Sequence, residues 1–329
     1  MTGLLSLFIL SLCVITAVGM VRARNLFAAV MLMGIFSLLM AVEFIMLDAP
    51  DVALTEAAVG AGISVVLLLS ALALTAKEEQ ARGISPALPL VVVLVTAGAI
   101  FYATFDKPAL GDPDAPVHRH VASEYFPMTR ERIEIPNVVT AVLASFRGYD
   151  TLGEVIVVLT AAIGVLFLIG PDAPYGQRGP SSGGMFVSGG LKHHQPLRIV
   201  GKIAIPFIIL FALYVQFHGE YSPGGGFQAG SLFAAAIILY GLLEGSTGAA
   251  NVIPTGVLRA MAAGGALIFG GTGIVTMLLG GNFLAYDVLR DDGVKAQQLG
   301  IIVIEAGVGI TVAGVLLVVY HAFATRGRA

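Results

Sequence analysis

The stretch Phe217-His-Gly-Glu-Tyr-Ser-Pro-Gly-Gly-Gly-Phe-Gln-Ala-Gly230 separates two long apolar runs of the chain. Three consecutive glycines behind Ser-Pro are typical of a turn. Irregular backbone beside a membrane span is tolerated only where protein or water covers it. The stretch therefore predicts either a flexible hairpin outside the membrane or a packed turn, and residue types alone favour the hairpin.

The composition on both sides of this stretch is that of an integral membrane protein. Of the 329 residues, 57% are hydrophobic and only 12% are charged, with a mean hydropathy of +0.90. A soluble domain carries roughly 25% charged residues. The net charge of −3 and the absence of a basic run give no indication of nucleic-acid binding. The one cysteine, Cys13, lies in the first apolar run, which excludes a disulfide framework.

Nine apolar segments are long enough to cross a bilayer, which takes about 20 residues of helix. They are residues 3–21, 26–47, 52–74, 86–105, 150–170, 197–217, 227–244, 257–279 and 298–321. The alternation expected of a membrane β-barrel is absent, so the predicted fold is an all-α polytopic membrane protein. With the N-terminus outside, eleven Lys and Arg residues fall on the cytoplasmic side and seven outside. The positive-inside rule therefore predicts an N-out, C-in topology.

Two polar segments divide the nine spans into groups of three, two and four. Residues 106–149 contain five prolines and predict a long outer loop, and residues 171–196 are rich in Gly, Pro and Ser. The expected units are a first module at 1–83, a second at 84–175, a linker at 176–196 and a third module at 197–329. No sequence repeat relates them, so an inverted-repeat transporter is not supported.

Charged residues inside spans are costly and are candidate functional groups. Five candidates for an ion or proton path are Glu43, Glu56, Glu154, Lys202 and Glu305. Glu305 is the deepest acid, and its alternative role is a hydrogen bond across a helix interface. Lys202 is more simply explained by snorkelling to the cytoplasmic surface.

Several polar residues near the span ends are secondary candidates. Asp150 and Glu154 share a helix face at i, i+4 spacing, where Asp150 is expected to cap the helix. His218 and Glu220 stand at the entrance of the glycine run. Asp48 and Asp51 are expected on a solvated loop face.

Other features of the chain exclude particular chemistries. The loop histidines have no acidic or cysteine partners at metal-ligand spacing, which speaks against a metal site. They are His118, His120, His193 and His194. No nucleophile–base pair or cofactor motif is present, so we expect no cofactor and no catalysis by this chain alone. Gly60 and Gly62 are expected either to allow close helix packing or to ease a π-bulge.

Three motifs give the chain a family resemblance. Residues 50–62, Pro-Asp-Val-Ala-Leu-Thr-Glu-Ala-Ala-Val-Gly-Ala-Gly, resemble a module found at the C-terminal end of MrpA and, as the separate protein MbhD, in membrane-bound hydrogenases. Residues 146–154, Phe-Arg-Gly-Tyr-Asp-Thr-Leu-Gly-Glu, look like the companion MbhE motif. Residues 218–230 are similar to the glycine signature of MrpB and MbhF. The first five spans also resemble the NuoJ-type subunit of respiratory complex I, which places Gly60 and Gly62 at a π-bulge.

The resemblance implies a subunit of a multi-subunit Mrp-type Na⁺/H⁺ antiporter in a bacterial or archaeal cytoplasmic membrane. Its implied partners are antiporter-like and small membrane subunits of the Mrp or Mbh type, together with Na⁺, H⁺ and the lipid bilayer. Glu56 and Glu154 match acidic positions of the motifs, and Lys202 and Glu305 are carried over with them. The fusion of modules that are usually separate leaves the host complex open.

Two alternative functions remain beside the antiporter. One is the membrane arm of a redox-driven ion pump, and the other is a scaffold in which the acids are paired and conduct nothing. The resemblance also changes the expectation for the glycine stretch. Pro223, Gly224, Gly225 and Gly226 become a family-signature turn, expected to pack against a neighbouring subunit.

Overall fold

The computed structural model describes residues 2–72, 75, 78–79, 87–109, 111–170, 195–245 and 252–325. Within these ranges the chain is helical and contains no strand; the one bridge pairs Asn25 with Glu78. Nine of the described helices are long and apolar enough to cross a membrane. The predicted all-α polytopic fold is therefore confirmed, whereas the N-out, C-in orientation stays a prediction.

Each predicted span overlaps one of the nine helices. They are α1 (Thr2–Arg22), α2 (Leu26–Met46), the continuous α3–η1–α4 (Pro50–Thr55, Glu56–Ile63, Ser64–Leu72), α5 (Ala87–Ala103) with η2 (Thr104–Asp106), α9 (Gly148–Ile169), α10 (Gln195–His218), α11 (Gly226–Glu244), α13 (Thr255–Leu278) and α14 (Gly293–Thr325). The last helix begins earlier than expected because Asp292 caps it. Its Oδ1 accepts hydrogen bonds from the backbone N–H groups of Val294 and Lys295.

The segment 106–149, expected to be a loop, is largely helical. It contains α6 (Pro116–Arg119), α7 (Val121–Met128), π-helical η3 (Thr129–Ile133), α8 (Val138–Ala141) and π-helical η4 (Val142–Phe146). Thr129 and Ile133 are fully buried. Among the prolines that suggested a loop, Pro116 occupies the first turn of α6, where no intrahelical N–H bond is lost, whereas Pro127 lies inside α7.

Part of the predicted organisation lies outside the described residues. This applies to most of the expected linker 176–196, including His193 and His194, and to the charges at Lys77, Arg82, Arg178, Lys192, Arg326 and Arg328. Only the last two positions of the linker are described, and they already belong to α10.

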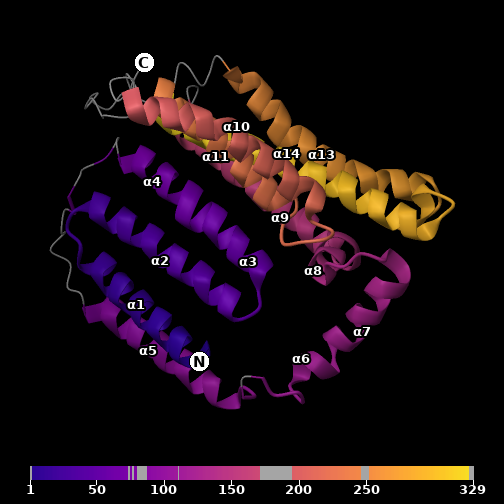
Figure 1. The fold of residues 1–329 in the computed structure, drawn as a ribbon, viewed down its shortest axis with the longest axis horizontal. Helices are drawn as coiled ribbons and strands as arrows, with labels where there is room; N and C mark the ends of the chain where they lie inside the picture. Colours follow the sequence, from indigo (N-terminus) through magenta and orange to yellow (C-terminus); the bar gives the residue numbers. More distant parts are fainter. Residues whose placement is uncertain are drawn as a thin grey trace.

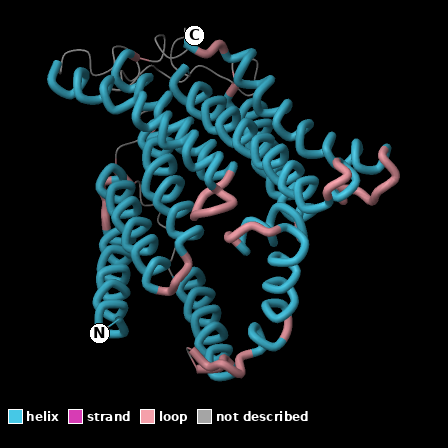
Figure 2. Tube along the Cα trace, turned by 45° about the vertical axis from the view of Figure 1, so that its right-hand side comes forward, coloured by secondary structure: helices cyan, strands magenta, loops and turns pink. Residues whose placement is uncertain are grey.

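Along the chain we distinguish a first group α1–α4, a second group α5–α9 and a third group α10–α14. The second group is extended, with α9 beside α14 (Figure 1). Helices α11 and α14 are the most buried of the described spans: 61% and 67% of the residues in their most apolar 18-residue stretches are buried. They pack on each other, with α10 against α11 and with α13 and α9 against α14. The first group joins them through η1 and α4. A second view shows the helices and the loops that connect them (Figure 2).

Close contact between α11 and α14 depends on glycine. A Cβ on Gly226 would collide with the carbonyl of Glu305, and a Cβ on Gly230 would lie 2.5 Å from the carbonyl oxygen of Gly309. Without side chains at these positions the two backbones touch, as small residues allow at membrane helix interfaces. This contact places the start of α11 beside the acidic position of α14.

Candidate functional site

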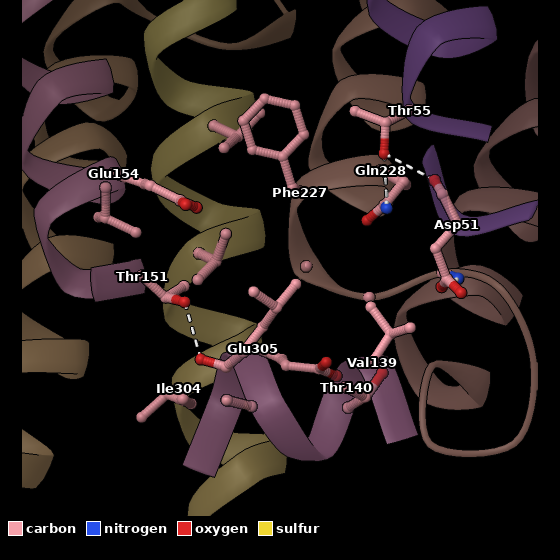
Figure 3. Close-up of a pocket in the computed structure, with 18 of the residues that line it drawn as sticks. Asp51, Thr55, Val139, Thr140, Thr151, Glu154, Phe227, Gln228, Ile304 and Glu305 are labelled. Carbon is pink, nitrogen blue, oxygen red and sulfur yellow. Dashed lines mark hydrogen bonds between the residues drawn. The ribbon is translucent and has the colours of Figure 1, made fainter. Parts of the chain in front are cut away.

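A cavity of about 280 Å³ lies where all three helical groups meet, between α3, α8, η4, α9, α11 and α14. Its polar lining residues come from five of these helices (Figure 3): Asp51, Thr55, Thr140, Thr151, Glu154, Gln228 and Glu305. The remaining lining is glycine and apolar side chains. Among the described residues that line it, none is Lys, Arg or His. The cavity therefore collects negative charge without an internal counter-charge.

Glu305 is enclosed by the glycine turn, which we define as residues 219–226. A Cβ on Gly225 would lie 3.1 Å from Glu305 Oε1, and a Cβ on Gly219 would lie 3.4 Å from Glu305 Oε2. Gly225 also has φ +123°, a conformation that side chains disfavour. The glycines thus let the backbone approach the carboxylate closely from the side opposite α14.

The glycine turn is packed and is not a free hairpin. Gly225 N–H donates to the carbonyl of Val215, and Gly224 N–H donates to Asp51 Oδ1 at 3.3 Å. Asn137 Nδ2 lies 3.1 Å from the carbonyl oxygens of both Gly219 and Ser222. The turn is therefore packed, and the groups that hold it come from all three helical groups of this same chain, whereas its packing against a neighbouring subunit stays a prediction.

Asp51 has a different place from the one expected. It was expected on a solvated loop face, but it is half-buried, lines the cavity and bonds to the glycine turn. One turn further along the same helix, Thr55 accepts a hydrogen bond of 2.8 Å from Gln228 Nε2. The start of this span is thus joined to the glycine turn and to α11 by two polar contacts, which a pattern of apolar runs does not reveal.

Glu220 lies in the glycine turn directly after Gly219, the residue that borders Glu305 Oε2. Glu220 Oε1 is buried and has no hydrogen-bond partner in the described part of the chain. Burial raises the pKa of the Glu220 carboxyl, because desolvation penalises the charged form. Glu220 is therefore an acid of the glycine turn whose charged form is disfavoured by burial.

Glu56 and Glu43 lie in the first helical group, away from the cavity. The π-helical segment η1 runs from Glu56 to Ile63, so Gly60 and Gly62 lie in the π-helix that the resemblance predicts. A Cβ on Gly60 would collide with the Glu56 carboxylate and lie 2.8 Å from Ser37 Oγ. Gly60 therefore leaves the space that the Glu56 side chain occupies beside α2.

Glu43 is only 4% exposed and accepts a hydrogen bond from Ser6 Oγ of α1. Its second oxygen, Oε2, is buried without a hydrogen-bond partner in the described residues. A buried carboxyl with one unsatisfied oxygen is costly when charged. Glu43 is thus a buried acid of the first helical group with one unsatisfied oxygen, separate from the cavity.

Lys202 belongs to an ion cluster at the opposite end of α10. Its Nζ lies 2.7 Å from Glu244 Oε1, and Arg198 Nε lies 2.6 Å from the same oxygen. The Arg198 side chain donates from two nitrogens to the two carboxylate oxygens, the strongest geometry for such a pair. Lys202 is therefore paired, and its 43% exposure agrees with a position near the membrane surface.

Asp150 and His218 do not line the cavity. Asp150 makes no capping hydrogen bond, contrary to expectation; it lies in the first turn of α9, exposed, and pairs with Arg147 at 2.6 Å. His218 ends α10 and stacks on Tyr214, with ring centroids 4.7 Å apart. Of the sequence-predicted candidates, only Glu154, Glu305 and the glycines come together in the cavity.

The sequence interpretation missed several polar residues of this region: Thr55, Asn137, Thr140, Thr151, Gln228 and, in the ion cluster, Glu244. A signal for some of them was present, since Thr55 and Gln228 are polar residues inside or beside apolar spans. Asn137 follows Pro136 and precedes a short apolar run, which is a helix-start pattern.

Three family models match successive parts of the chain. Residues 11–77 match MbhD, described as the D component of MBH, and residues 92–174 match MbhE, described as its E component. Residues 196–318 match a domain related to the MnhB subunit of Na⁺/H⁺ antiporters. The three matches follow one another along the chain without overlap.

Two curated relatives and one solved structure extend this similarity. A putative antiporter protein of Staphylococcus haemolyticus, mnhB2, is 32% identical over 126 residues, which cover 37% of this chain and 89% of that protein. The A/B subunit of a probable K⁺/H⁺ antiporter of Rhizobium meliloti is 26% identical over 78% of this chain. A chain of the Mrp complex from Dietzia sp. DQ12-45-1b matches 98% of this chain with a TM-score of 0.74 and 26% identity.

The chain spans only part of the two longer proteins. It covers 27% of the Rhizobium relative and 35% of the chain in the Dietzia structure.

Proposed function

The chain belongs to the family of MnhB-type antiporter subunits, and we propose that it is a membrane subunit of an Mrp-type cation/proton antiporter. Segments of the MbhD and MbhE types precede its MnhB-type domain. We assign these three parts to modules at 1–83, 84–175 and 197–329. The partners are other membrane subunits of the same complex, in the cytoplasmic membrane of a bacterium or archaeon.

The observation that carries this proposal is the cavity in which all three parts of the chain place polar groups. Glu154 and Glu305 face it from α9 and α14, and Asp51 borders it from α3. A carboxylate at membrane depth is costly when charged and unpaired. Such a group takes up either a proton or a metal cation. Competition between the two for one set of oxygens is the elementary step of cation/proton exchange.

Hydroxyl and amide groups complete the lining in a way that suits a partly hydrated monovalent cation. Thr140, Thr151 and Gln228 offer neutral oxygens beside the carboxylates. The volume of about 280 Å³ leaves space for several water molecules. The site thus supplies charge from acids and solvation from neutral groups, without a resident positive side chain among its described residues.

Exchange in everted membrane vesicles tests the proposal, with the complete set of subunits expressed in cells that lack other antiporters. We expect Glu305→Gln and Glu154→Gln to lower Na⁺- or K⁺-dependent proton release by at least about tenfold. Glu131→Gln, a change of an exposed acid in η3, serves as the control and keeps the original rate. Unchanged exchange in both cavity variants would favour the scaffold alternative.

The second candidate function is a subunit of a redox-driven ion pump. It is supported by the two family models described as MBH subunits, which cover the first and second helical groups. The subunits that co-purify with the chain separate the two functions. Iron–sulfur or NiFe subunits in the purified complex would replace the antiporter assignment, whereas an assembly of membrane subunits alone would support it.

A further inference from the structure

Asn137 is fixed in orientation by the helix that it begins. Its side-chain Oδ1 accepts hydrogen bonds from the backbone N–H groups of Val139 and Thr140, at 2.9 and 3.3 Å. These bonds cap the N-terminus of α8. Because both capping partners are donors, the amide oxygen must face the helix, and the NH₂ group must face the other way.

The NH₂ group faces two other parts of the chain. Asn137 Nδ2 lies 3.1 Å from the carbonyl oxygens of Gly219 and Ser222 and 3.4 Å from Asp51 Oδ1. The backbone N–H of Asn137 donates to the carbonyl of Glu220 at 3.0 Å. Asn137, in the second helical group, thereby contacts both the glycine turn and Asp51 of the first group.

Thr140 adds a second bond to the same turn. Its Oγ1 donates to the carbonyl of Gly219 at 2.8 Å, and the residue is 5% exposed. Gly219 is also the residue whose missing side chain leaves room for Glu305 Oε2. The two side-chain donors, Asn137 and Thr140, therefore act on the part of the turn that touches the carboxylate.

The charged surroundings of Glu305 make its position sensitive to this turn. Glu220 follows Gly219, the residue that borders the Glu305 carboxylate. Glu154 of α9 and Asp51 of α3 line the same cavity as Glu305. Like Glu220, both are acids, and no described residue lining the cavity is basic. A displaced turn changes the separation of Glu305 from Glu220 and from the backbone of Gly225 together.

We propose that Asn137 is a positioning residue: its amide fixes the glycine turn against Glu305 and so sets the affinity of the cavity for its cation. This inference rests on the proposed antiporter function and concerns the same cavity. Asn137 acts through the turn, whose glycines are the groups that approach the Glu305 carboxylate.

The test compares two variants of Asn137 in the full complex, again in everted vesicles. Asn137→Ser keeps an oxygen that can cap α8 but loses the NH₂ donor. Asn137→Asp keeps the cap and replaces the donor by an oxygen facing Asp51 and two carbonyls. We expect the Na⁺ or K⁺ concentration for half-maximal exchange to rise about threefold to tenfold in Asn137→Ser. The maximal rate per assembled complex stays within about twofold.

Asn137→Asp is expected to change the pH profile as well. The added carboxyl meets Asp51 and the carbonyls of Gly219 and Ser222, all of them acceptors. Repulsion of its charged form displaces the turn further, and the added negative charge favours protonation of the neighbouring acids. The pH of half-maximal exchange therefore moves upward relative to Asn137→Ser.

Asn137→Asp also covers the case in which Asn137→Ser does not assemble, because it keeps an oxygen that caps α8 and loses the NH₂ donor to the carbonyls of Gly219 and Ser222. Original kinetics in Asn137→Ser or, where that variant does not assemble, in Asn137→Asp would overturn the inference. A loss of assembled complex with unchanged kinetics per complex would do the same.

Glu305→Gln in the same membranes separates this inference from the proposed function. Loss of exchange in Glu305→Gln with original kinetics in Asn137→Ser contradicts the positioning role alone. Full exchange in Glu305→Gln contradicts the proposed site, and the inference with it.

Discussion

The cavity around Glu305 and the ion cluster of Glu244 are both built from charges near or within membrane helices, yet their charges are balanced in opposite ways. Glu244 is held by Arg198 and Lys202 within 2.7 Å. Glu305 is bordered by glycine backbone and shares its cavity with further acids, and no basic residue is among the described residues that line the cavity. One acid is thus neutralised inside the chain, and the other is not.

This difference separates structural from exchangeable charge. A carboxylate with its own cation gains little from binding another, whereas an unpaired carboxylate in a low-dielectric site must be neutralised from outside. We therefore propose a stabilising role for Glu244 and an ion-handling role for Glu305. Four substitutions test this difference between Glu244 and Glu305, in order from the largest expected effect to the smallest.

The largest effect is expected from giving the cavity a cation of its own. Gln228 lines the cavity and bonds to Thr55, so Gln228→Lys places an ammonium group among the acids. We expect exchange to fall by at least about tenfold, because the lysine takes the place of the transported ion. Gln228→Met, similar in size and uncharged, is the control in the same vesicle assay. Equal rates in the two variants would show that the missing counter-charge is irrelevant.

The reverse change removes the acid from the ion cluster. Glu244→Gln leaves Arg198 and Lys202 without their shared carboxylate and is expected to lower the melting temperature of the complex slightly, because the two cations are partly exposed to solvent. Thermal denaturation of the purified complex measures this decrease. Exchange per assembled complex should stay at the original level, and a large loss of exchange at full assembly would contradict the structural role.

Glu56 is a third acid, which either handles ions or stabilises the fold. A substitution at Gly60 distinguishes the two roles, because Gly60 lies against the Glu56 carboxylate. Gly60→Ala presses a methyl group against the Glu56 carboxylate, whereas in Gly62→Ala the new Cβ lies 3.6 Å from the carbonyl oxygen of Ala57, an ordinary contact. If Glu56 handles ions as Glu305 does, Gly60→Ala lowers the exchange rate severalfold and Gly62→Ala changes it little. Similar rates in both variants would place Glu56 with the structural charges.

The smallest effect concerns pH and the acid in the glycine turn. Because burial raises the pKa of Glu220, the unfolded chain loses this proton at lower pH than the folded protein. The folded state then binds more protons, so stability falls as pH rises above the ordinary pKa of a glutamate, about 4.3. Glu220→Gln should raise the melting temperature of the complex at neutral pH, with the difference vanishing under acid conditions. A melting temperature of Glu220→Gln below that of the original complex at neutral pH would contradict the upward direction of the Glu220 pKa shift.

Much of the fold could be predicted from the sequence, because a membrane span leaves a long apolar run that no other structure explains as well. The segment 106–149 could not, since its short helices bury only a few side chains, such as Ile133, and leave no periodic pattern. Its prolines are also compatible with a loop.

The candidate site was predicted in part. Glu154 and Glu305 stood out because acids inside apolar runs are rare. Asn137 and Asp51 did not, since their importance comes from contacts with residues far away in the sequence. The same holds for the pairing of Lys202 with Glu244. Sequence indicates which charges are deep, and only the three-dimensional contacts indicate which of them are paired.

Modification of Glu305 by a hydrophobic carbodiimide tests the central claim most directly, because such reagents react with protonated carboxyl groups at membrane depth. The purified complex would be treated with dicyclohexylcarbodiimide at increasing Na⁺ or K⁺, with choline as the inert cation, and labelling of Glu305 quantified by mass spectrometry. We predict that the transported cation lowers labelling of Glu305 in a saturable way and that choline does not. Labelling of Glu305 that is independent of both Na⁺ and K⁺ would contradict the account.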